Sequence, residues 1–179
     1  MKKNFMIFIV CFVFLILTGC RIYSMGVMEN PEFKKGMTPT DLDEKLLEKY
    51  TIGKVTVQPR ITYADPAQTK FKLLIVFFSK TTSSVVSINT VTLSINGQRF
   101  DYGEQIVNKK SISNWELYPA NEPFYVCSVR GKPIDLLKDK IIQSRIDVSL
   151  NVSIEEEGEK VITKKIDSYF IGEKKSFLE

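Results

Sequence analysis

The sequence contains no histidine among its 179 residues. This absence excludes Ser-His-Asp and Cys-His nucleophilic catalysis, and it excludes every zinc site that needs an imidazole ligand. The chain also lacks a Gly-rich phosphate loop and an EF-hand-like ladder of Asp and Asn. Most common enzyme classes are thereby removed, so we expect no catalytic residue, no bound metal and no cofactor.

A strong charge of one sign is also missing. The 25 Lys and Arg residues oppose 21 Asp and Glu residues, which gives a net charge of +4 at pH 7. Lysine pairs at 34–35, 109–110, 164–165 and 174–175 are spread along the chain. A nucleic-acid binder would concentrate its basic residues on one face. We therefore expect no nucleic-acid partner, and we interpret the lysine pairs as solvated surface and edge-strand protection.

No apolar run is long enough to cross a bilayer. The longest, residues 5–17, has thirteen residues, whereas a membrane span needs about 20. Lys2 and Lys3 precede the run, and the small residues Thr18 and Gly19 follow it. This order of basic, apolar and small residues predicts a secretory signal peptide over residues 1–19. The alternative, an N-terminal membrane anchor with an incidental cysteine, fits the length less well.

The apolar run ends in Leu17-Thr18-Gly19-Cys20, which resembles the lipobox of bacterial lipoproteins. The resemblance implies acylation of the Cys20 thiol, cleavage between Gly19 and Cys20, and acylation of the new amino terminus. Stable anchoring takes about two acyl chains, so a protein modified in this way stays on the membrane. Residue 21 is Arg, and an Asp at that position would resemble an inner-membrane retention signal. We therefore expect a lipid-anchored protein of the outer membrane that faces the periplasm.

The remaining chain is expected to hold one domain. We predict a lipidated tether over residues 20–37, a short amphipathic helix over 38–50, a β-domain over 51–172 and a C-terminal tail over 173–179. Thr38 is the expected helix cap, with Pro39 at the first helical position and Asp41 three residues after the cap. The apolar face of this helix is expected to pack on the domain and consists of Leu42, Leu46, Leu47 and Tyr50.

Cysteine is scarce, and Cys11 lies inside the segment expected to be removed. Once Cys20 is acylated, Cys127 has no disulfide partner, so the domain must be held together by its apolar core alone. We interpret Cys127 as a small buried hydrophobe that shares a face with Tyr125 and Val129. The alternative, a reactive thiol, lacks the histidine or cationic cluster that would lower its pKa.

From residue 52 the apolar pattern has a period of two. We expect strands over residues 52–58, 70–79, 85–95, 98–102, 124–129, 142–154 and 160–171, and a brief helical turn over 132–137. Residues 70–79 are apolar on both faces, as in a central strand, and 142–154 alternate as in an antiparallel sheet. Asn96-Gly97 predicts a tight hairpin. We interpret the acidic run 155–159 as a solvated hairpin tip and not as a metal site.

About seven strands with few helices predict a mainly β fold. We expect an antiparallel two-sheet sandwich of immunoglobulin-like arrangement, with a short N-terminal helix. Tyr125-Val126-Cys127 resembles the Tyr-x-Cys near the end of immunoglobulin domains. The chain departs from that pattern in having no partner cysteine and in having two expected strands after Cys127 where such a domain usually has one.

Residues 102–123 have no clear period and include the only tryptophan of the chain. We identify Tyr102, Trp115 and Tyr118 as candidate partner-binding residues, because aromatic side chains on loops of a rigid domain supply large contact areas. The alternative is that Trp115 and Leu117 plug the end of the core. Four acids of this region could supply a carboxylate pair for glycan cleavage, although the sequence fixes no separation between them: Asp101, Glu104, Glu116 and Glu122.

These observations leave three hypotheses of function. The favoured one is a non-catalytic, lipid-anchored adaptor that binds another envelope or secreted protein. The second is an immunity lipoprotein that neutralises a toxin directed at the periplasm, which a neighbouring toxin gene would indicate. The third is a glycan-acting envelope enzyme, whose activity would disappear when Glu104 or Glu116 is replaced by Gln.

Overall fold

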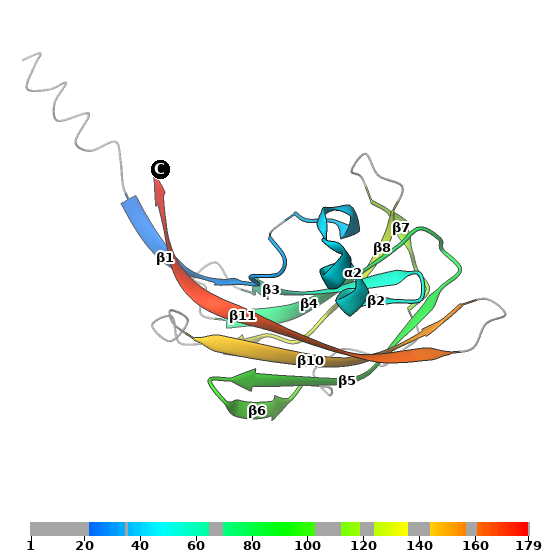
Figure 1. The fold of residues 1–179 in the computed structure, drawn as a ribbon. Coiled ribbons are helices and arrows are strands. Elements are labelled where there is room, and N and C mark those ends of the chain that lie inside the picture. The colour runs from blue at the N-terminus through cyan, green and yellow to red at the C-terminus, as the bar shows by residue number, and fades with distance from the viewer. Residues whose placement is uncertain are drawn as a thin grey trace, which may run out of the picture.

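The computed structural model describes residues 22–34, 36–64, 70–102, 112–118, 124–135, 144–156 and 161–178. These residues form two antiparallel sheets, with one short α-helix beside them (Figure 1). The first sheet has the order β1 (Ile22–Glu29), β11 (Ile162–Leu178), β10 (Arg145–Glu155), β5 (Val85–Ile95) and β6 (Gln98–Asp101). The second has the order β2 (Thr51–Ile52), β3 (Val55–Tyr63), β4 (Lys70–Ser79), β8 (Tyr125–Arg130) and β7 (Glu116–Leu117), and β9 (Ile134–Asp135) also pairs with β4.

The strand order is that of an immunoglobulin-like sandwich, which confirms the predicted fold class. Strands β3-β4-β8-β7 correspond to the A-B-E-D sheet of that fold, and β6-β5-β10-β11 correspond to C′-C-F-G. Cys127 lies on β8, in the E position. The Tyr-x-Cys of immunoglobulin domains belongs to strand F, so the resemblance of Tyr125-Val126-Cys127 to that motif is wrong in position. The two strands that follow Cys127 are the F and G equivalents.

The core between the sheets is built from the alternating patterns of the long strands. Along β10 every second residue is at most 1% exposed: Ile146, Val148, Leu150, Val152 and Ile154. The same core cluster contains the equally buried Phe71, Leu73, Ile75 and Phe77 of β4. Burial of each such side chain contributes about 1.5–3 kcal/mol. The alternation read from residues 142–154 is therefore confirmed over the part of that range the structure describes.

Strand β4 is apolar on its outer face as well, as a central strand should be. Val76 and Phe78 form a second buried cluster with Phe124. The partly buried residues Leu74, Tyr118 and Val126 pack against this cluster. The predicted bounds of this strand, 70–79, and its central place between β3 and β8 are both confirmed.

The hairpin between β5 and β6 is also confirmed. Asn96 has φ of 48° and Gly97 has φ of 86°, and two consecutive positive values define the type I′ turn that Asn-Gly favours. The Asn96 side chain adds a tertiary contact, because its Oδ1 accepts a hydrogen bond from the backbone N–H of Arg145 at 2.9 Å.

The predicted tether and C-terminal tail are wrong over most of their length. Residues 22–29 are strand β1, and β11 continues to residue 178, so the tether and tail segments pair with each other. The register runs from Ile22 opposite Leu178 to Glu29 opposite Ile171. Each strand is stabilised by backbone hydrogen bonds to a partner about 150 residues away along the chain, and a residue pattern does not show such pairing.

The predicted helix over 38–50 is divided in two. A 3₁₀ turn, η1 (Pro39–Asp41), is followed by the α-helix α2 (Glu44–Tyr50). Between them Leu42 is buried in an extended conformation, and Asp43 caps α2 by accepting a hydrogen bond from the Leu46 N–H at 2.8 Å. On the predicted apolar face, Tyr50 and Leu42 are buried while Leu47 is exposed.

Two further local predictions are corrected. Ile134 and Asp135, expected in a helical turn, form β9 and pair with Phe71 and Lys70. Glu156, expected in a solvated hairpin tip, is buried and accepts a hydrogen bond from the Lys54 N–H at 2.8 Å. Its second carboxylate oxygen lies 3.0 Å from Lys54 Nζ. Glu156 therefore joins the β10–β11 end of one sheet to the β2–β3 hairpin of the other.

Candidate functional site

The predicted lipidation and cleavage residues, Cys20 and Gly19, lie outside the described residues. The three predicted partner-binding residues lie within them, but they do not share one surface. Tyr102 and Trp115 pack with the core between the sheets, whereas Tyr118 packs on the outer face of the second sheet.

Tyr102 is a core residue. It is 1% exposed, and its hydroxyl donates a hydrogen bond to the Lys132 carbonyl. Burial raises the pKa of this phenol. The expectation that Tyr102 contacts a partner is therefore corrected, because its side chain offers no accessible surface.

Trp115 is partly buried against the main core, and its indole Nε1–H donates to the Ser84 carbonyl at 2.7 Å. A satisfied indole against the core fits the alternative that Trp115 closes the end of the sandwich. Its neighbour Leu117 does not share that role, since it is 67% exposed on β7.

Tyr118 is half-buried beside the second cluster. Its ring meets Phe78 edge-on, with 5.6 Å between the ring centroids. Phe78 also contacts Phe124, and the Arg60 guanidinium lies 5.9 Å from the centroid of the Phe78 ring. The aromatic side chain of Tyr118 thus covers apolar residues of this chain and leaves only part of its surface for a partner.

The candidate catalytic carboxylates are not brought together by anything the structure describes. Glu116 is exposed on β7, while Glu104 and Glu122 lie outside the described residues. In the part of the chain that is described, no group of three or more His, Cys, Asp or Glu residues could hold a metal ion. Cys127 is buried, and burial raises the pKa of its thiol to about 12, which keeps the thiol protonated at neutral pH.

Sequence reasoning missed a polar hollow on the outer face of the first sheet. The hollow has a volume of about 650 Å³ and is open to solvent. Lys49 of α2 and Arg99 of β6 are among the residues that line it. We call it the polar hollow, and its floor is formed by three neighbouring strands through Thr92, Ser94, Asp147, Ser149, Lys165 and Asp167. These polar residues face outward on the strands whose inward-facing residues form the core. The alternation of polar and apolar residues along these strands therefore already indicated a polar outer face.

Both carboxylates of the polar hollow, Asp147 and Asp167, are ion-paired within the protein. Arg145 contacts Asp147 at 2.8 Å and lies 4.5 Å from the centroid of the Tyr169 ring, and Lys165 contacts Asp167 at 3.0 Å. Burial alone would raise the pKa of Asp167, but hydrogen bonds from Ser149 and Lys165 and the charges of Lys165 and Lys49 outweigh it and hold the pKa below its usual value. The Asp167 carboxylate is thus an ionised acceptor at neutral pH.

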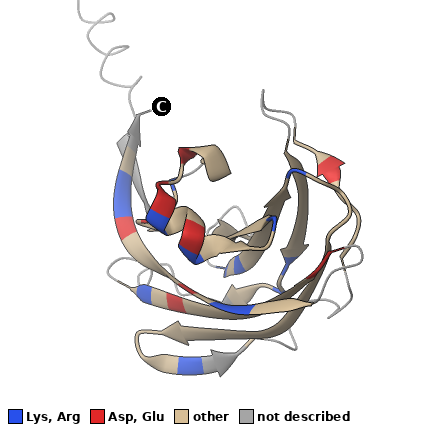
Figure 2. Cartoon of the chain, turned by 45° about the vertical axis from the view of Figure 1, so that its right-hand side comes forward, with Lys and Arg blue, Asp and Glu red and all other residues tan. Residues whose placement is uncertain are grey.

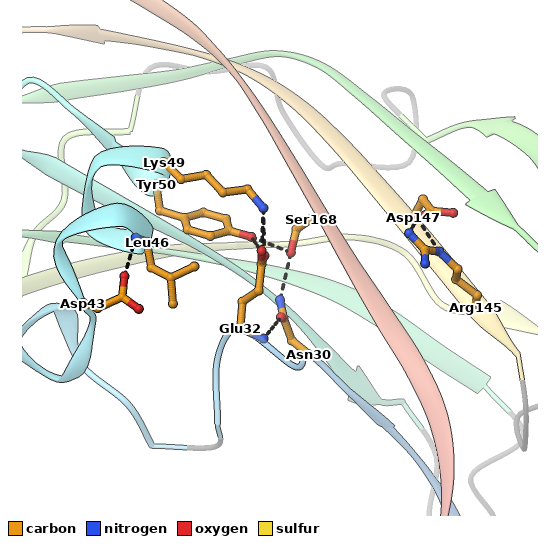
Figure 3. A network of polar contacts seen from close by, with 9 residues as sticks. All are labelled: Asn30, Glu32, Asp43, Leu46, Lys49, Tyr50, Arg145, Asp147 and Ser168. Carbon is orange, nitrogen blue, oxygen red and sulfur yellow. Dashed lines mark hydrogen bonds and ion pairs between the residues drawn. The ribbon is translucent and has the colours of Figure 1, made fainter.

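A second polar group fixes α2 to the edge of β11 (Figure 3). Tyr50 is fully buried, and its hydroxyl donates a hydrogen bond to Glu32 and lies 3.1 Å from Ser168 Oγ. Asn30 donates to Ser168 Oγ at 2.8 Å, and Lys49 Nζ contacts Glu32 at 2.7 Å. Burial, together with the Glu32 carboxylate, raises the pKa of Tyr50 well above its usual value. This group positions Lys49 at the rim of the polar hollow.

We expect Tyr50→Phe to lower the free energy of unfolding by about 2 kcal/mol, because it removes a buried hydrogen bond to a charged group. Lys49→Met removes the partly exposed ion pair to Glu32 and the contact of Nζ with the Tyr50 ring, 4.9 Å from its centroid, and it should cost less than about 1 kcal/mol. Urea unfolding of both variants measures the difference. A larger loss in Lys49→Met than in Tyr50→Phe would contradict the assigned hydrogen bond.

In the part of the chain that the structure describes, positively and negatively charged residues are interspersed along α2 and β11 (Figure 2).

No helix in the described residues is long and apolar enough to cross a membrane. Comparison of the chain with protein-family models, with curated proteins and with solved structures found no match. The fold of the described residues is that of an antiparallel two-sheet β-sandwich, and the function has to be argued from the residues of this chain.

Proposed function

We propose that the protein is a lipid-anchored, non-catalytic binding module of the bacterial cell envelope, which holds another envelope or secreted protein. The anchor is Cys20 of the lipobox-like Leu17-Thr18-Gly19-Cys20. The observation that carries the proposed binding role is the polar hollow on the outer face of the β5-β10-β11 sheet.

The chemistry of the polar hollow supports binding over catalysis. Its carboxylates Asp147 and Asp167 are ion-paired to Arg145 and Lys165, so neither is set up as a general acid or base. The hydroxyls of Thr92 and Ser94 and the paired charges provide donors and acceptors for a polar interface. Hydrogen bonds and shape can specify a partner on such a rigid sheet face.

An in-cell photocrosslinking experiment tests this role. A photoreactive amino acid at Ser94, in the polar hollow, should give a discrete adduct with one partner protein in intact cells. The matched control is the same amino acid at Ser83, an exposed residue in the loop between β4 and β5, which should give no such adduct. The identity of the captured protein distinguishes an adaptor from an immunity protein, because the latter would capture a toxin.

Equal crosslinking at Ser94 and Ser83, or none at Ser94, would overturn the assignment of the binding surface to the polar hollow. Independent metabolic labelling with a palmitate analogue tests the anchor. Label should enter the parent protein and be absent from Cys20→Ser, and equal absence from both would overturn the anchor.

A further inference from the structure

Strands β1 and β11 form a two-stranded ribbon that extends beyond the body of the sandwich. Strand β10 pairs with β11 only as far as Ile171, whereas β1 pairs with residues 171–178. At about 3.4 Å per residue, the seven residues beyond Ile171 span roughly 24 Å. Figure 1 shows β1 and the end of β11 projecting together from the body.

An isolated two-stranded ribbon is only marginally stable in water, but this one is fixed at its root. Met28 and Gly172 are buried where the ribbon meets the sandwich. Asn30, directly after β1, donates a hydrogen bond to the buried Ser168 of β11. Along the ribbon Lys175 pairs with Glu29. The ribbon is thus continuous with the rigid body of the domain.

The free end of the ribbon lies next to the proposed anchor. Arg21 is the one residue between Cys20 and the first residue of β1. Two residue steps of extended chain reach about 7 Å. An acylated Cys20, whose chains enter the bilayer, therefore restrains Ile22 and its partner Leu178 to within that distance of the membrane surface.

The composition of this end suits the interfacial layer of a bilayer. The first two pairs of the ribbon are Ile22 with Leu178 and Tyr23 with Phe177, and the exposed Lys174 follows a few residues away. Apolar and aromatic residues followed by lysine are typical of membrane interfaces. The interfacial region on each side of the hydrocarbon core is about 5–8 Å thick, and two pairs at about 3.4 Å per residue fill it.

We infer that the end of the β1–β11 ribbon lies in the lipid headgroup layer and acts as a rigid stalk, so that no flexible tether separates the domain from the membrane. This inference rests on the proposed lipid anchor. Leu178 at the end of β11 is then membrane-proximal. The β2–β3 and β10–β11 ends of the sandwich point away from the bilayer, because β11 runs from that end to the ribbon. The polar hollow lies on the sheet face between these two ends and stays accessible in the envelope.

Site-directed fluorescence on the acylated, full-length protein tests the stalk. A single cysteine is introduced at Ser176, an exposed position near the end of the ribbon, or at Ser83 in the loop between β4 and β5, near the opposite end of the sandwich. Each is labelled with an environment-sensitive dye. The native Cys127 is buried and does not compete for the label. Vesicles of phosphatidylethanolamine and phosphatidylglycerol carry a nitroxide quencher on the lipid headgroup.

The dye at Ser176 should lose most of its fluorescence and shift to the blue, whereas the dye at Ser83 should be unaffected. Mass spectrometry of the same samples reports acylation of Cys20. With Cys20 acylated, an unquenched dye at Ser176 overturns the stalk alone, and equal quenching at both sites overturns it in favour of a domain lying flat. An unmodified Cys20 overturns the proposed anchor, and the stalk with it.

Discussion

Gly131→Ala should destabilise the domain by about 3 kcal/mol or more, because its methyl group has no space. A Cβ at position 131 would lie 2.5 Å from Cζ of Tyr102, and closer still to Cε1 and the hydroxyl oxygen of that ring. Neither partner can move easily. Gly131 is buried and its N–H donates to the Leu73 carbonyl at 2.8 Å, while Tyr102 is 1% exposed with its hydroxyl bound to the Lys132 carbonyl. Urea or thermal unfolding measures the loss.

A double-mutant cycle separates this clash from a general effect of the substitution. Tyr102→Leu removes the ring that the new methyl group would meet, so Gly131→Ala should cost at least about 1 kcal/mol less in the Tyr102→Leu background than in the parent. An equal cost in both backgrounds would show that the contact with Tyr102 is not the cause.

Raising the pH above 9 should progressively destabilise the folded protein. Burial raises the pKa of the Cys127 thiol from 9.0 to about 12. In the unfolded chain the thiol loses its proton above pH 9, whereas the folded chain keeps it, so the unfolded state is increasingly favoured as pH rises from 9 to 12. At about 1.4 kcal/mol per pH unit, this single group removes roughly 4 kcal/mol across that window.

Buried tyrosines add to the same trend. The pKa values of Tyr50 and Tyr102 are raised, mainly by burial, from an ordinary value of 10.0. Below pH 10 both phenols are protonated in the folded and the unfolded chain, so burial of the hydroxyls costs no stability. Above pH 10 the unfolded chain loses these protons while the folded chain keeps them, and the free energy of unfolding falls. The titration of Cys127, Tyr50 and Tyr102 should therefore leave the urea concentration at the midpoint of unfolding unchanged between pH 7 and about 8.5. Above pH 9 this midpoint should fall, and the fall should become steeper as the pH rises.

Cys127→Val is the matched control for the thiol, because valine has a similar volume and does not titrate. Between pH 9 and 10, below the onset of the tyrosine contribution, this variant should show a flatter decline than the parent. Parallel curves for parent and Cys127→Val would mean that the thiol titrates normally and is not buried as described.

The sequence was most informative where structure depends on local pattern. The bounds of β4 and β5 agree with the predicted 70–79 and 85–95, since the alternation of apolar residues follows directly from the geometry of a strand. The Asn96-Gly97 turn was predictable because positive φ values at both positions are a property of these two residue types. Fold class followed from the number and spacing of such segments.

The candidate site was less predictable from its residues. Tyr102, Trp115 and Tyr118 were identified as surface aromatics because their segment has no period, yet Tyr102 is in the core and the other two are partly buried. Glu156 belongs to an acidic run that reads as solvated, but a lysine about 100 residues earlier pairs with it. In each case the environment is created by a distant segment, and a one-dimensional pattern carries no information on which segment that is.

The sequence by itself determined the long strands β4, β5 and β10, the tight hairpin and the antiparallel sandwich, because backbone geometry and the alternation of apolar side chains are local properties. The tertiary structure alone decided that residues 22–29 pair with the C-terminal strand, that α2 is fixed to β11 through Tyr50, and that outward-facing polar residues of three strands form one hollow. These features join residues far apart in the chain, and their stability comes from hydrogen bonds and burial that exist only once both partners are folded.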